Sequence, residues 1–121
     1  MKKGLLALSL ALTLPAFSSY AASGAVYGKV HTIALAGKNA QWGPGYDGYV
    51  WIALEGVNTA GTCPTTSYSD NLIRFFIPPE DELMVSFALT AKAAGMQLGI
   101  DWNDSMKQAG GECLARDVNL K

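Results

Sequence analysis

The feature that most constrains the fold is a pair of cysteines, Cys63 and Cys113, the only two in the chain. In an oxidising compartment cysteines form disulfides, and two cysteines allow a single intrachain pairing. Closing a loop of about 50 residues stabilises a fold by roughly 4 kcal/mol in the chain-entropy model, a large share of the total for a small domain. We therefore predict a Cys63–Cys113 disulfide if the chain is exported.

The N-terminal segment has the features of a signal peptide. Two lysines precede an apolar run over residues 4–17, which is too short to span a membrane. Ser19 and Ala21 are small residues at the −3 and −1 positions of a cleavage site, so cleavage is predicted after Ala21, with Ala22 as the alternative. We expect residues 1–21 to be removed and the mature protein to be periplasmic or secreted, without membrane insertion.

The remaining residues, 22–121, are enough for one domain. Half of the chain is hydrophobic and 16% is charged, which excludes disorder and coiled coil. Loss of Lys2 and Lys3 with the signal reduces nine basic residues to seven against ten acids, a net charge of −3. A negative charge disfavours nucleic acid, whose binding rests on cationic side chains.

Alternating apolar residues predict five strands, over residues 25–36, 49–55, 72–77, 96–102 and 113–120. The alternation of the first strand changes parity near His31, which predicts a bend or bulge there. The segments 38–48, 56–70 and 103–111 are rich in glycine and polar residues and are predicted to be loops.

One helix is predicted over Pro79–Ala94. A proline followed by three acids suits a first helical turn, and Gly95 stands where a left-handed residue ends a helix. Apolar residues at helical spacing are expected to face the core, namely Leu83, Phe87, Ala91 and Ala94, flanked by Met84 and Ala88.

The order of three strands, one helix and two strands, with a long bent first strand, resembles the OB fold, a five-stranded Greek-key barrel. With the signal peptide and the single disulfide, the mature chain is similar in element order to the receptor-binding B subunits of AB5 toxins. This resemblance implies a ring of subunits with helices lining a central pore and binding of cell-surface glycans.

Residues for catalysis or metal binding are few. His31 is the one histidine and lies within a predicted strand, the disulfide would use both cysteines, and no hydrolase, zinc-protease or phosphate-loop motif occurs. Oxygen donors for calcium gather near one loop, but without the spacing of a calcium loop: Asp101, Asn103, Asp104 and Glu112. We therefore predict no enzymatic activity, no metal and no cofactor.

Aromatic side chains suggest a binding surface. If Val50, Ile52 and Leu54 fill the barrel together with alternate residues of the third strand, the side chains between them must point outward. In an OB fold, ligands bind on this outer face and at the loops joining strands one to two and four to five. The predicted ligand-binding residues are Trp42, Tyr46, Tyr49, Trp51, Arg74 and Phe76.

Such a face could serve protein–protein contact, glycan stacking or packing within the chain. We predict an exported, non-enzymatic binding module, a homo-oligomer that recognises a glycan or a protein partner. The alternative is a stand-alone periplasmic structural or inhibitor-like protein in which the aromatic side chains are buried.

Overall fold

The computed structural model describes residues 22–36, 44–108 and 110–121, so the predicted signal peptide lies outside the described residues. The described part is mainly β with one α-helix. In chain order the elements are β1 (Ser23–Leu35), η1 (Pro44–Tyr46), β2 (Val50–Leu54), β3 (Thr65–Thr66), η2 (Ser67–Ser69), β4 (Leu72–Ile73), β5 (Phe75–Ile77), α1 (Glu82–Ala94), β6 (Gln97–Lys107) and β7 (Cys113–Leu120).

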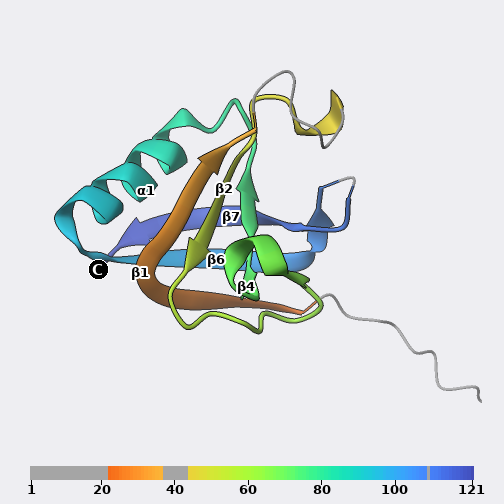
Figure 1. The fold of residues 1–121 in the computed structure, drawn as a ribbon, viewed down its shortest axis with the longest axis horizontal. Helices are drawn as coiled ribbons and strands as arrows, with labels where there is room; N and C mark the ends of the chain where they lie inside the picture. The colour runs from red at the N-terminus through yellow and green to blue at the C-terminus, as the bar shows by residue number, and fades with distance from the viewer. Residues whose placement is uncertain (1–21, 37–43, 109) are drawn as a thin grey trace, which may run out of the picture.

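Five strands form a closed barrel in the order β1-β2-β5-β7-β6 (Figure 1). All neighbours are antiparallel except β5 and β7, which are parallel and pair at Phe76 and Leu114. β1 closes the barrel because its first half, from Ser23 to Lys29, pairs with β6, and its second half pairs with β2. A separate two-stranded sheet is formed by β3 and β4.

The predicted bend in β1 is confirmed. The register with β2 shifts between Val30 and Thr32, so His31 is the extra residue of a bulge. A bulge leaves backbone groups outside the ladder, and Lys92 of α1 satisfies two of them: its Nζ donates to the carbonyl oxygens of Val30 at 3.2 Å and of His31 at 3.0 Å. The helix is thereby tied to the point where the strand turns.

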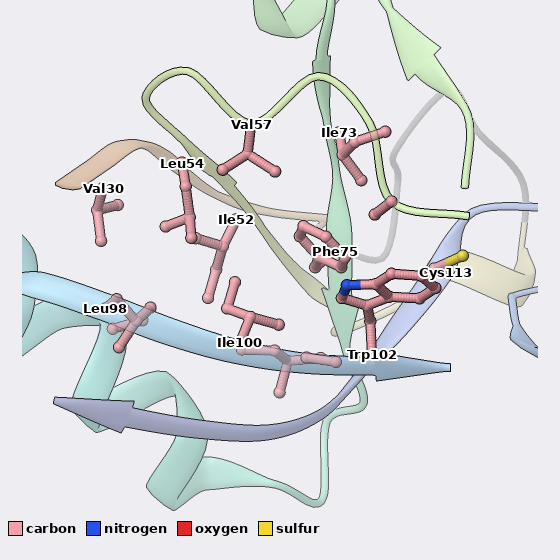
Figure 2. Packing of buried hydrophobic residues seen from close by; sticks show 14 of the residues in the cluster. Val30, Ile52, Leu54, Val57, Ile73, Phe75, Leu98, Ile100, Trp102 and Cys113 are labelled. Atoms are coloured by element: carbon pink, nitrogen blue, oxygen red, sulfur yellow. The ribbon is translucent and has the colours of Figure 1, made fainter. Parts of the chain in front are cut away.

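Alternate residues of the strands fill the barrel, as the sequence predicts. Ile52 and Leu54 of β2 and Phe75 of β5 are fully buried in one cluster, with Leu98 and Ile100 of β6 opposite them (Figure 2). The intervening side chains of β2 and β5 belong to a second buried cluster on the outer face, which contains Trp51, Ala53 and Phe76.

The helix ends as predicted, but it presents a different face to the barrel. Gly95 has a left-handed conformation (φ 64°) and closes the helix, but α1 begins at Glu82 and not at the predicted Pro79. Ala88 and Ala91 are the fully buried residues of α1, whereas Leu83 and Phe87 are 75% and 42% exposed. The prediction that Leu83, Phe87 and Ala94 face the core is therefore wrong, whereas Ala91 is buried as predicted. Small side chains let the helix approach the barrel closely, and because apolar residues surround most of α1, their spacing alone did not select the face.

Two strand boundaries also differ from the prediction. The third predicted strand is divided at Arg74 into β4 and β5, because Thr65 and Thr66 pair with β4 while β2 pairs with β5. β6 continues to Lys107 through residues expected to form a loop, since Lys107 still pairs with Cys113 of β7. Within the described ranges, no helix is long and apolar enough to cross a membrane.

The predicted disulfide is present: Cys63 and Cys113 are bonded, with their Cα atoms 5.5 Å apart. It attaches the long segment between β2 and β3 to the start of β7. A second attachment is Asp104 of β6, whose Oδ2 accepts hydrogen bonds from the backbone N–H of Thr62 at 3.0 Å and from its hydroxyl at 3.2 Å. These hydrogen bonds, the backbone one above all, hold the pKa of Asp104 below the ordinary aspartate value of 3.8.

We predict that Asp104→Asn weakens the acid sensitivity of the fold. A carboxylate whose pKa is lower in the folded than in the unfolded state contributes stability above its ordinary pKa, and this contribution is lost as the pH falls through the folded-state value. Urea unfolding between about pH 7 and pH 2 measures the effect: the wild type should lose more stability on acidification than Asp104→Asn.

Thr62→Val is the matched control, because it removes the hydroxyl and keeps the backbone donor. It should retain most of the wild-type pH dependence. Equal pH dependence in the wild type and Asp104→Asn would show that this attachment does not stabilise the fold.

Candidate functional site

Five of the six predicted ligand-binding residues lie together on the outer face of β2 and β5. Trp51 is on β2, Phe76 is on β5, and Arg74 lies between β4 and β5. Tyr46 ends η1 and Tyr49 precedes β2, and both pack against the buried pair Trp51 and Phe76. The sixth residue, Trp42, lies outside the described residues.

Arg74 is the charged centre of this cluster. Its guanidinium carbon lies 5.3 Å from the ring centroid of Trp51 and 5.6 Å from that of Phe76, distances at which a cation is attracted to an aromatic face. Its Nη2 is 3.5 Å from Oε1 of Glu112, and both side chains are largely buried. The positive charge is therefore held between two aromatic rings and one carboxylate.

Tyr46 connects the two sides of the cluster. Its hydroxyl donates a hydrogen bond to Oε2 of Glu112 at 3.0 Å, and its ring meets Phe76 edge-to-face at 5.7 Å. Burial, and then the interaction with Glu112, raise the pKa of Tyr46 above its ordinary value of 10.0. Tyr46 is therefore a neutral hydrogen-bond donor at physiological pH.

The residues after β6 close over the cluster. The side chain of Gln108 donates a hydrogen bond to the backbone oxygen of Gly45. The backbone N–H of Gln108 donates to the backbone carbonyl oxygen of Glu112 at 2.7 Å. Gly110 lies so close to Tyr46 that a β-carbon at this position would overlap the tyrosine hydroxyl. The segments before β2 and before β7 thus meet at Tyr46, and this contact requires a glycine at position 110.

The expectation of an open aromatic face is wrong for two residues. Trp51 is 5% exposed and Phe76 is fully buried within a single chain. They do point away from the barrel interior, as the alternation predicts, but Tyr46, Tyr49, Leu72, Leu114 and Arg74 pack against them. Tyr46 and Tyr49 are half-buried, so they are the aromatic residues of this cluster that a ligand can reach directly.

Two partners at the site were not predicted as such. The sequence indicates Glu112 only as one oxygen donor among four, and it places Gln108 in a loop without a role. The sequence signal for Glu112 is its position next to Cys113. The disulfide of Cys113 fixes the backbone there and so limits where the Glu112 side chain can reach. The four oxygen donors are in fact dispersed, with Asp104 bound to Thr62 and Glu112 to Tyr46. Among the described residues, no three His, Cys, Asp or Glu side chains are grouped so that they could hold a metal ion.

His31 lies apart from this cluster. Its Nε2 is 3.0 Å from Oδ2 of Asp70, and its Nδ1 is 2.7 Å from the hydroxyl of Thr32. Asp70 follows η2 and is well exposed, so the pair is screened by water and links the β1 bulge to the β3–β4 hairpin. Sequence reasoning placed His31 on a strand and did not identify this partner.

Comparisons with protein-family models, with curated proteins and with solved structures found no match to this chain.

We predict that Trp51→Ala destabilises the protein by about 3–5 kcal/mol, the range for deleting a buried aromatic side chain. Trp51→Phe, which keeps a ring at this position, should cost less. Urea unfolding of the mature, oxidised protein measures both. An unchanged unfolding midpoint in Trp51→Ala would contradict the packing described here and restore Trp51 as an exposed ligand contact.

Proposed function

We propose that this chain is an exported, non-enzymatic binding module with an OB-fold barrel, which forms a homo-oligomer and recognises a glycan or a protein partner. The strand order β1-β2-β5-β7-β6, the parallel pairing of β5 with β7 and the helix between β5 and β6 support the OB-fold assignment. The disulfide supports export, because disulfides persist in oxidising compartments.

One observation carries the proposed binding site. The two segments that precede β2 and β7 meet on the outer face of the barrel, around the Tyr46–Glu112–Arg74 contacts. In OB folds the loops at these two positions border the ligand. The residues here are two half-exposed aromatic rings, Tyr46 and Tyr49, beside the largely buried polar side chains of Gln108 and Glu112.

This combination suits a ligand that has both apolar faces and hydrogen-bonding groups. A tyrosine ring can pack against the flat face of a sugar or an apolar side chain. The Tyr46 ring is held for such a contact because its hydroxyl is bound to Glu112. The buried ion pair beneath holds the surface residues in place, which lowers the entropic cost of binding. We therefore place the binding site at the rim of the cluster, at Tyr46 and Tyr49, with Trp51, Arg74 and Phe76 as its support.

The experiment is a comparison of the mature, oxidised wild type with Tyr49→Ala on a glycan array and in capture of proteins from a periplasmic extract. The wild type should bind a defined glycan or protein, and Tyr49→Ala should bind it at least tenfold more weakly, a loss of about 1.4 kcal/mol. Tyr68→Ala, which alters an 83% exposed tyrosine on η2, is the matched control and should bind like the wild type.

If Tyr49→Ala binds as well as the wild type while Tyr68→Ala does not, the proposed position of the site is wrong. If no glycan or protein is bound at all, the binding function itself is wrong.

A second candidate function is supported by the burial of Trp51 and Phe76 within the chain. It is the stand-alone periplasmic structural or inhibitor-like protein, in which the outer aromatic cluster serves stability alone. It differs from the first proposal in its prediction for Tyr49→Ala. This substitution would lower the free energy of unfolding and would not remove binding to any glycan or partner protein.

A further inference from the structure

Among the described residues, the second half of β1 pairs with a strand on one edge only. Residues Ser23–Lys29 pair with β6, but from Val30 to Leu35 the pairing is with β2 on the opposite edge. Among the described residues, no strand pairs with the other edge of Val30–Leu35. Figure 1 shows α1 beside this half of β1.

The backbone groups that face this edge can be identified from the ladder. The N–H of Ala36 donates to Tyr49 at 2.8 Å, and its carbonyl accepts from Gly48 at 2.7 Å, so Ala36 faces the β2 side. Backbone groups alternate along an antiparallel strand, so Ala34 also faces β2 and the N–H and C=O groups of Ile33 and Leu35 face away.

Hydrogen bonds from α1 protect only the first part of this edge. Proteins protect exposed strand edges with charged residues, prolines, bulges or covering elements. The bulge at His31 and the hydrogen bonds from Lys92 protect the edge up to His31. Beyond it, Thr32–Leu35 contains no charge and no proline, and the Leu35 side chain is 70% exposed.

This segment is complementary to itself. In antiparallel pairing about a two-fold axis at Ala34, Ile33 of one copy lies opposite Leu35 of the other, and the reverse. The backbone N–H and C=O groups of both residues face away from β2, so each pair of opposite residues exchanges two hydrogen bonds. The segment is uncharged, so two copies meet without repulsion between like charges.

The helix beside this edge supplies further contact area. A stable interface buries about 800 Å² on each partner, more than four strand residues provide. Leu83 and Phe87 of α1 are exposed apolar side chains, and α1 lies along the same side of β1 (Figure 1). An apolar helix face exposed on a small domain marks an interaction surface.

We propose that the free edge of β1, Thr32–Leu35, pairs with the same edge of a second copy of this chain to form a two-fold symmetric dimer with α1 at its border. Two-fold interfaces are the commonest in homo-oligomers. This proposal specifies the assembly part of the proposed function and is independent of the ligand site.

The test is the mass of the mature, oxidised protein by light scattering on a sizing column. The wild type should have the mass of two copies, or of an even number. Leu35→Lys places a charge on the edge and should halve that mass at the same concentration, with association weakened at least tenfold. Tyr68→Lys changes an exposed side chain on η2 and should leave the mass unchanged.

Amide hydrogen exchange distinguishes loss of the interface in Leu35→Lys from misfolding of the variant. In the wild type the amides of Ile33 and Leu35 should be protected, and in the variant the Ile33 amide and the amide at position 35 should exchange faster while Thr32 and Ala34, bonded to β2, stay protected.

Three results would overturn the inference: a monomeric wild type, an assembly whose mass Leu35→Lys does not change, or an odd-numbered ring. An odd-numbered ring would leave the proposed homo-oligomer in place and reject this interface alone. A monomeric wild type would reject the homo-oligomer as well, and in neither case would the ligand-binding proposal be affected.

Discussion

The bend of β1 at His31 is the constraint on which the rest of the structure depends. The barrel closes because β1 is shared between β6 and β2, and the register shift between Val30 and Thr32 lets β1 pair with both. The carbonyl groups released by the bulge are bound by Lys92, so the bend also fixes the helix. The same bend leaves the last residues of β1 with one edge to which no strand of the described residues is paired.

Buried side chains form a layer on each face of β2 and β5. Their inward side chains fill the core, and their outward side chains are covered by a second layer that includes Tyr46, Arg74 and Glu112. Burying a charged pair is costly unless its hydrogen bonds are satisfied. The Tyr46 hydroxyl and the two flanking rings supply that compensation, which makes the cluster a rigid base for the half-exposed tyrosines above it.

Periodicity predicted most of the fold. Alternation located the strands, the parity change at His31 predicted the bulge, and the cysteine count predicted the disulfide, because each of these signals is local or has one solution. The face of α1 was not predictable in this way, since apolar residues lie on nearly every side of the helix and packing through Ala88 and Ala91 decides the outcome.

That Trp51 and Phe76 lie on the outer face was predictable, and their burial was not. Alternation correctly separates Trp51 and Phe76 from the barrel interior, but whether an outward side chain is covered depends on segments distant in sequence. Here the covering residue Tyr46 is held by Glu112, which is 66 residues away. No local pattern encodes such a contact, whereas the disulfide beside Glu112 explains its position once the fold is known.

The most direct test of the central claim, that ligand binding occurs where the segments before β2 and β7 meet, is to locate a bound ligand on the isotope-labelled mature protein by NMR. Titration with the best-bound glycan or captured protein should shift the amide signals of Tyr46, Tyr49, Gly110 and Glu112 first. Shifts confined to α1 or to the β3–β4 hairpin, with these four signals unchanged, would contradict the account.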